Sequence, residues 1–253
     1  MGEARWLLLR AAKNAAERFR YSEMIVKTFV VTPFQQNARI VACERTRRAV
    51  VIDPGDAAGA RRIASTLDRL GLALQAIALT HAHVDHIGGV SELKRLKPDA
   101  EIILHPADEA LYRALPEQPM WLGIPRSEWP SLGLVYESPP PIDRHWADED
   151  EYELGDLRFV IYHTPGHAPG HVVLFESKER ALFGGDCLFA GSIGRTDLPG
   201  GSFEELIDSI ENKILPLGDD VRVYTGHGPE TTIGQERRTN PFLTGAYLVY
   251  KPR

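Results

Sequence analysis

Four side chains able to bind a metal ion occur within a span of six residues. They are His81, His83, Asp85 and His86 of the segment THAHVDH, which follows an apolar run typical of a buried strand and precedes a helical pattern. Side chains of a strand alternate in direction, so His81 and His83 point to one side, and Asp85 and His86 reach the same space from the turn into the helix. Three imidazoles and a carboxylate packed together without a cation would be poorly satisfied. The segment therefore predicts a metal site.

Four more side chains share one character: each is polar, each lies at a strand end or in a loop, and each has glycine or proline nearby. They are Asp53, His167, Asp186 and His227. Glycine allows the backbone to approach a crowded site closely, and functional groups tend to lie on loops held by a rigid sheet. Each of the four taken alone is compatible with a structural role. Together with the first segment they predict one shared site.

The elements that must position these side chains follow from the apolar patterns, which alternate strands with helices and so favour an α/β fold. Strands are predicted at Ile25–Val31, Arg39–Cys43, Ala49–Ile52, Ala73–Leu79, Glu101–Leu104, Leu157–Tyr162, Val172–Phe175, Ala181–Phe183 and, as the last strand, Val221–Tyr224. Helices are predicted at Ala57–Leu70, at residues 90–96 before Pro98, and at Ser202–Leu215, where Ser202 and Glu205 form a capping box.

Composition narrows the range of functions. The chain has 253 residues and a formal net charge of −6, which argues against nucleic acid as a partner. No apolar run approaches the roughly 20 residues that a membrane span requires. Cys43 and Cys187 lie far apart and show no CxxC spacing, so we expect reduced thiols and a cytoplasmic protein.

The chain is predicted to form one domain with an appendage. Residues 1–23 are interpreted as an N-terminal extension, because the first strand-like run begins just after Met24. Residues 24–253 form the domain. Within it, residues 115–142 are rich in proline and aromatic residues and predict a covering loop with short helical turns, and residues 231–253 form a short tail.

The order of the predicted ligands along residues 25–230 resembles the signature of the metallo-β-lactamase superfamily. The resemblance implies a four-layer αβ/βα sandwich, in which two mixed sheets face each other, helices cover the outside and two metal ions lie at one edge. It implies that the first ion is held by His81, His83 and His167, the second by Asp85, His86 and His227, with Asp186 shared between them. Asp53 matches a position that orients a ligand histidine. Of the other histidines, we assign His105, His145 and His163 to structure and leave His171 open.

The implied ligand set consists of imidazoles and carboxylates without a thiolate, which favours two zinc ions, with iron or manganese as alternatives. Two divalent ions, two aspartates and a bridging hydroxide leave a charge of about +1, suited to stabilising an oxyanion. Such a pair generates hydroxide at neutral pH and polarises a carbonyl, so the expected chemistry is hydrolysis, with Asp85 the ligand assigned to catalysis.

Two further segments resemble glyoxalase II: residues 185–197 (GDCLFAGSIGRTD) and residues 236–243 (ERRTNPFL). The resemblance implies a small-molecule thioester substrate, S-D-lactoylglutathione, cleaved to glutathione and D-lactate. In that family a basic residue grips glutathione, and Arg195 occupies its place. The alternative is that Arg195 pairs with Asp197. The larger enzymes of the family append a helical domain, which is absent here, so the chain is similar to the small single-domain bacterial type.

Three alternatives remain. A persulfide dioxygenase on the same fold would hold one iron through His81, His167 and Asp186, although the sequence GHGP at residues 226–229 differs from the usual pattern of that family. A lactonase would use the same two-metal site. A metal-binding module without catalytic activity would bind the ions and turn over no ester, thioester or persulfide.

Overall fold

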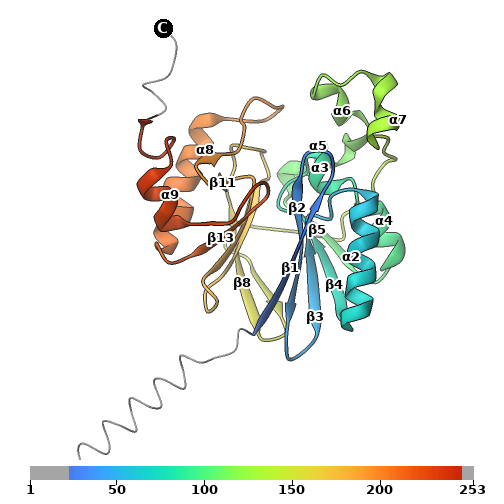
Figure 1. The fold of residues 1–253 in the computed structure, drawn as a ribbon, viewed down its shortest axis with the longest axis horizontal. Coiled ribbons are helices and arrows are strands. Elements are labelled where there is room, and N and C mark those ends of the chain that lie inside the picture. Colours follow the sequence, from blue (N-terminus) through green and yellow to red (C-terminus); the bar gives the residue numbers. More distant parts are fainter. Residues whose placement is uncertain (1–22, 247–253) are drawn as a thin grey trace, which may run out of the picture.

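The structure is a computed structural model that describes residues 23–246, so the predicted extension lies outside the described residues except for Glu23. Two six-stranded sheets face each other, with helices on the outer side of each (Figure 1). The first sheet has the strand order β1 (Met24–Val31), β2 (Gln36–Cys43), β3 (Arg48–Ile52), β4 (Ala73–Ala78), β5 (Glu101–Leu104) and β6 (Arg144–His145). The second has the order β14 (Thr231–Thr232), β13 (Arg222–Thr225), β10 (Ala181–Gly185), β9 (Val172–Glu176), β8 (Leu157–His163) and β7 (Glu151–Leu154).

Both sheets are mixed. In the first, β1 to β3 are antiparallel and β3 to β6 are parallel. In the second, β10 and β13 are parallel and the other pairs are antiparallel. A short hairpin of β11 (Leu188–Phe189) and β12 (Ser192–Ile193) lies apart from both sheets. The predicted fold class, an αβ/βα sandwich of two mixed sheets, is confirmed.

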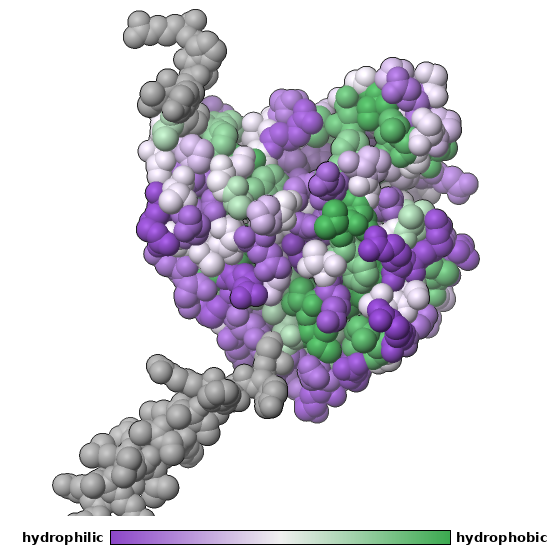
Figure 2. Space-filling view, viewed as in Figure 1, coloured by the Kyte–Doolittle hydropathy of each residue, from purple (hydrophilic) through white to green (hydrophobic). Residues whose placement is uncertain are grey.

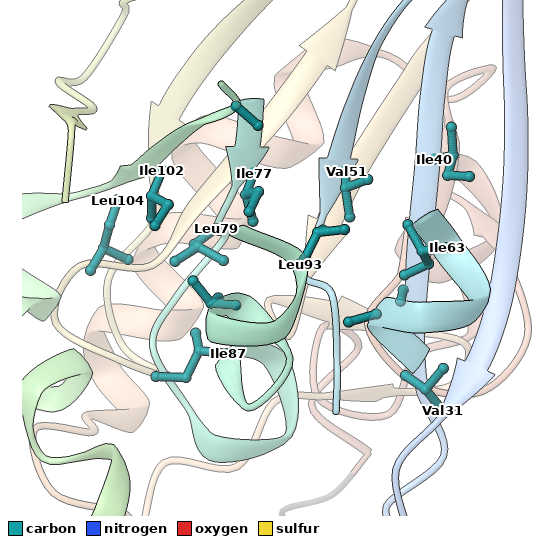
Figure 3. Packing of buried hydrophobic residues seen from close by; sticks show 14 of the residues in the cluster. Val31, Ile40, Val51, Ile63, Ile77, Leu79, Ile87, Leu93, Ile102 and Leu104 are labelled. Carbon is teal, nitrogen blue, oxygen red and sulfur yellow. The ribbon is translucent and has the colours of Figure 1, made fainter. Parts of the chain in front are cut away.

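The layers arise from the alternation of apolar side chains along the strands. In β2, Ile40 and Ala42 belong to the core beneath the helices, whereas Val41 and Cys43 belong to the core between the two sheets. Strands buried on both faces read as continuous apolar runs, which is the pattern of the second half of β2, of β3 and β5 after their first residue, and of the last three residues of β4. In Figure 3, Val51 and Ile77 of this sheet lie with Ile40 beside the helices that cover it.

The helices of the first half are α2 (Ala57–Leu70), α3 (Val84–Ile87) and α4 (Val90–Leu96), and Figure 3 shows Ile63 of α2 and Leu93 of α4 in this outer core. The segment after β5 holds short helical turns and the helices α5 (Glu109–Arg113), α6 (Gln118–Trp121) and α7 (Trp129–Leu132). Short helical turns are thus present in the region predicted as a covering loop, and Figure 2 shows hydrophobic residues at the surface over α6 and α7, where Met120 and Leu132 are exposed. None of the helices within residues 23–246 has the length and apolar character needed to cross a membrane.

The helix predicted at Ser202–Leu215 begins as expected and then changes its geometry. Ser202 Oγ accepts a hydrogen bond from the N–H of Glu205 at 3.3 Å, and α8 (Phe203–Ser209) follows. Residues Ile210–Ile214 form a π-helical turn. Leu206, Ile210 and Ile214 are fully buried and follow one another at intervals of four residues. In a regular α-helix of about 3.6 residues per turn, this interval would rotate each successive side chain further around the helix axis. The wider π turn reverses this rotation, so all three side chains face the core.

The tail and several short strands differ from the prediction. Val221–Tyr224 is not the last strand, because β14 follows it, and the part of the tail described here contains α9 (Ile233–Thr239). Gly234 lowers the helix propensity of α9, so its pattern is weak, and tertiary contacts compensate. The buried Glu236 carboxylate accepts hydrogen bonds from Gly191 N at 2.8 Å and Asn240 Nδ2 at 2.9 Å. The tail therefore braces the β11–β12 hairpin. Strands β6 and β7 were also not predicted.

Candidate metal centre

The parallel strands of the two sheets end at one common edge, the upper one in Figure 1, between α8 and β11 on one side and α5 and α6 on the other. Asp53 follows β3, the segment 80–86 follows β4, Asp186 follows β10 and His227 follows β13. His167 lies in the loop that joins β8 to β9. All the predicted site residues except Arg195 are buried or half-buried here.

Three imidazoles form the first group. His167 Nε2 lies 2.8 Å from His83 Nδ1 and 3.2 Å from His81 Nε2. A tetrahedral cation bound at about 2.0–2.1 Å from each nitrogen places the nitrogens about 3.3 Å apart, so the spacing suits a metal ion. His81 and His83 come from the first sheet and His167 from the second, so the group spans the two halves of the sandwich.

The second group consists of Asp85, His86 and His227, and it also draws on both halves. Asp85 Oδ2 lies 3.1 Å from His227 Nε2 and 3.9 Å from His86 Nε2. Asp186 lies between the two groups. Its Oδ1 is 3.3 Å from His86 Nε2, and its Oδ2 is 3.5 Å from both His167 Nε2 and His227 Nε2. The carboxylate of Asp186 thus faces both groups, as a shared ligand must.

Hydrogen bonds on the far side of each ring fix which nitrogen carries the proton. His167 Nδ1 lies 2.7 Å from the carbonyl oxygen of Arg195, and His227 Nδ1 lies 3.0 Å from that of Phe34. A carbonyl oxygen can only accept, so each Nδ1 carries the hydrogen and each Nε2 directs a lone pair into the site. His86 Nδ1 donates to Asp53 Oδ2 at 2.9 Å in the same way.

His81 also carries its proton on Nδ1 and directs the lone pair of Nε2 into the site, because of a hydrogen bond to Thr80. Thr80 Oγ1 donates to Asp53 Oδ2 at 2.6 Å, so it accepts from His81 Nδ1 at 3.0 Å, and His81 Nε2 is left with a lone pair. His81 Nε2 and His167 Nε2 therefore face each other as two acceptors, and the ring proton of His83 can serve only one of them. Buried acceptors of this kind need a cation.

Orphaned polar atoms support the same conclusion. His86 Nε2 and Asp186 Oδ1 are buried and have no hydrogen-bond partner within the described residues. Buried polar atoms in native proteins are almost always satisfied, and an ion is one of the standard explanations for an exception. The donor chemistry and the geometry fit two divalent cations.

The electrostatics of the cluster differ between its histidines: the imidazoles of His81 and His83 are neutral, whereas carboxylates surround His86. Burial and the neighbouring His167 lower the pKa of His83 to about 3, and burial lowers the pKa of His81 well below its usual value, so both rings are neutral, as ligands must be. Burial also acts to lower the pKa of His86, but Asp186, Asp85 and Asp53 raise it well above its usual value. A divalent cation would balance these carboxylates.

Asp53 orients the first ligand segment. Its Oδ1 accepts from Thr80 N at 2.8 Å, and its Oδ2 accepts from Thr80 Oγ1 and His86 Nδ1. Asp53 has φ = 51°, a left-handed conformation that aspartate tolerates better than most residues and that recurs at functional sites. Asp53, His81 and His86 also lie close enough to hold an ion, but these hydrogen bonds already satisfy the carboxylate of Asp53.

Glycine is required where the strands of the second sheet approach the ligands. A Cβ atom on Gly226 would lie 2.0 Å from Asp186 Oδ1. A Cβ atom on Gly185, which has φ = 46°, would lie 2.6 Å from both His171 Nε2 and Thr80 Oγ1. The glycines beside Asp186 and His227 thus leave room for the carboxylate.

The remaining histidines lie outside the two ligand groups. His171, which the sequence left open, is fully buried, and its Nε2 accepts the N–H of Asp186 at 3.0 Å. His171 therefore positions the shared ligand. His105 and His163 stack with ring centroids 4.0 Å apart, and His163 Nε2 donates to the carbonyl of Pro169 at 2.8 Å. His145 pairs with Glu109 at 2.7 Å.

One buried carboxylate escaped the sequence analysis. Asp108 is fully buried, and its Oδ2 accepts from Ala82 N at 2.9 Å while its Oδ1 accepts from Gly170 N at 2.5 Å. Burial raises the pKa of the Asp108 carboxyl to about 6, although both N–H groups act to lower it. Asp108 joins the segment of His81 and His83 to the loop of His167. It follows β5 as the other site residues follow their strands, and that position was the available signal.

The Asp108→Asn variant is expected to bind metal about 10- to 100-fold more weakly, as is usual when the groups that orient ligands are changed. The amide NH₂ of the asparagine would face the N–H of either Ala82 or Gly170 and could not accept its hydrogen bond. Either the segment of His81 and His83 or the loop of His167 would then lose this contact. Competition with a chromogenic chelator measures the affinity. Asp143→Asn is the matched control, because Asp143 accepts from Ile102 N at 2.9 Å at the start of β5, away from the site. Equal metal affinities for the two variants would contradict this role.

A pocket of about 360 Å³ opens at the two candidate ligand groups. Its floor includes His83, Asp85, His167, Asp186 and His227. The wall is mostly apolar and consists of Phe34, Val84, Trp121, Leu122, Phe189, Ile193 and Leu198, with Gln118, Ser192 and Arg195 as its polar members. The predicted substrate residue Arg195 thus lies at the pocket, but its guanidinium binds Asp197, with Nε 2.7 Å from Oδ1 and the second nitrogen 2.7 Å from Oδ2.

A four-layer sandwich with a histidine and aspartate metal cluster at one edge and a pocket above it defines the class of a metallo-hydrolase. The family model described as metallo-beta-lactamase superfamily matches residues 31–227. The chain belongs to the metallo-beta-lactamase superfamily.

Similar proteins cover nearly the whole domain. The hydroxyacylglutathione hydrolase GloC of Haemophilus influenzae is 40% identical over 221 residues, which are 87% of this chain and 98% of that protein. Among solved structures, the BLEG-1 B3 metallo-beta-lactamase is 40% identical with a TM-score of 0.74, over 87% of this chain and all of that one (100%). TTHA1623 in a di-iron-bound form is 37% identical with a TM-score of 0.72, over 86% of this chain and 100% of that one.

Proposed function

We propose that the chain is a metal-dependent hydrolase of 2-hydroxyacyl thioesters, with S-D-lactoylglutathione as its reference substrate. The observation that carries the proposal is the pair of ligand groups, joined by Asp186, at the floor of a substrate-sized pocket. The 40% identity to a protein named hydroxyacylglutathione hydrolase supports the substrate class.

In this assignment His81, His83 and His167 hold one divalent cation, Asp85, His86 and His227 hold the other, and Asp186 is shared. Zinc is the first choice, and iron or manganese suits the same donors. Two such cations supply a hydroxide nucleophile at neutral pH and polarise the carbonyl of the substrate. Asp85 faces the pocket beside His227, so it acts where the substrate binds.

The chain's own residues favour a substrate with a good leaving group. Among the described residues that line the pocket, none is a lysine, tyrosine or glutamate, and the Nε2 atoms of His167 and His227 face the site as acceptors. An amine leaving group would need a proton donor, whereas a thiolate with a pKa of about 8.5 leaves with little help. The wall therefore supports thioester over amide hydrolysis.

Elemental analysis together with a thioester assay tests the proposal. We expect two metal ions per chain and release of free thiol from S-D-lactoylglutathione, because both ligand groups are complete. A single iron, oxygen consumption with glutathione persulfide and no thiol release would overturn it in favour of the dioxygenase. Hydrolysis of a lactone in preference to every thioester would point to the lactonase. Bound metal without turnover of any of these substrates would leave a binding module.

A further inference from the structure

The pocket wall contains few side chains that could bind a charged part of a substrate. Arg195 is the only cationic side chain among the described residues that line it. The donors of the two uncharged polar side chains among them already have partners, since Gln118 Nε2 donates to the carbonyls of Ala82 at 2.7 Å and Leu111 at 2.9 Å, and Ser192 Oγ donates to that of Ile193 at 3.4 Å. A charged carrier arm that lies along this wall, away from the candidate ligands of the floor, would therefore find few charged partners.

The guanidinium group of Arg195 already binds another side chain of the protein. Two of its guanidinium nitrogens bind the two carboxylate oxygens of Asp197, which is the geometry that would otherwise grip a substrate carboxylate. Its backbone is fixed as well, because its carbonyl accepts from His167 Nδ1. The pair is solvent-exposed, with 53% and 68% of the two side chains accessible, so it holds Arg195 with modest strength and cancels its charge at the pocket mouth.

We propose, building on the proposed function, that the pocket recognises the carrier arm of its thioester by apolar contact rather than by charge, and that Asp197 sets this preference by occupying Arg195. The substrates of this class are thioesters with uncharged aryl or alkyl carriers, bound at least as well as glutathione thioesters. Glutathione brings two carboxylates and one ammonium group. Apolar side chains gain by covering an apolar arm, whereas an unpartnered carboxylate near them loses hydration.

Binding of two inert thioethers to the metal-loaded protein tests this without turnover. The probes are S-benzylglutathione and its neutral N-acetyl dimethyl ester, compared by calorimetry. We expect the neutral probe to bind at least as tightly as the charged one. Phe189→Ala should weaken both probes alike, because Phe189 belongs to the apolar wall and its side chain carries no charge.

The Asp197→Asn variant is the decisive one. Freeing Arg195 should strengthen binding of the charged probe by about two- to fivefold, the scale of an exposed ion pair, and leave the neutral probe unchanged. Asp220→Asn is the matched control, because Asp220 makes the same two-point contact with Arg180 at 3.0 and 2.6 Å, outside the pocket lining. It should change neither probe.

The inference is overturned if the charged probe binds wild-type protein more than about tenfold tighter than the neutral one and Arg195→Ala removes the difference. It is also overturned if Asp197→Asn and Asp220→Asn behave alike. The proposed function fails separately, by absence of thioester turnover in the metal-loaded enzyme, because the binding comparison needs no reaction.

Discussion

The Asp186→Ala variant is expected to lose both metal ions and, with them, hydrolytic activity by a factor on the order of 10³ or more. Asp186 faces both ligand groups, 3.3 Å from His86 Nε2 and 3.5 Å from His167 Nε2 and His227 Nε2. Its removal takes a negative ligand from each ion at once. Metal content after gel filtration and thiol release from S-D-lactoylglutathione measure the two losses.

Loss of the fold would give the same kinetic result, so thermal unfolding of the metal-free proteins is compared as well. Without metal, the Asp186 carboxylate lies 3.3 Å from His86, whose pKa it raises, so the metal-free variant is expected to be less stable than metal-free wild type but still to unfold in one cooperative transition. The control is His145→Ala, which removes an imidazole that is 46% exposed and pairs with Glu109 outside the two ligand groups. It should keep both ions and full activity. An Asp186→Ala protein that retained two ions per chain would refute the shared-ligand assignment.

The Asp85→Ala variant should have a narrower effect. It removes a ligand from the second group alone, so the three imidazoles of the first group and Asp186 still hold one ion. We expect one metal ion per chain and a fall in kcat on the order of 10²-fold or more, with KM nearly unchanged, because the loss concerns the transition state rather than the pocket wall. Elemental analysis with steady-state kinetics tests this. Two retained ions with wild-type kcat would show that Asp85 is no ligand.

Much of the site could be predicted because its residues carry a local signal. The strand patterns place Asp53, Asp186 and His227 at strand ends, and parallel strand ends converge in space. The carbonyls of Phe34 and Arg195 carry no such signal, although they fix the protons of His227 and His167. Any residue offers a carbonyl, so only the fold reveals which one is used.

The elements that escaped prediction depend on distant contacts. The α9 helix is short and contains Gly234, and it is held by the bonds from Glu236 and Asn240 to the β11–β12 hairpin. The π turn after α8 follows from packing, which a capping pattern at Ser202 cannot foretell. Asp108 was missed for a different reason: it ends a helical turn three residues beyond the strand-end His105, and its partners are backbone groups of two other loops.

Each ligand group takes side chains from both halves of the sandwich, so metal binding is linked to the docking of the two halves. Neither half alone presents more than a fragment of either group: the segment of His81 to His86 follows β4, and His167, Asp186 and His227 belong to the second sheet. In the proposed assignment, each metal site is complete only after the two halves have docked, and the bound ions would then link the two halves. Removal of the ions should increase local opening between the two halves at the edge that carries the site, while the apolar core between the sheets keeps the rest of the interface packed.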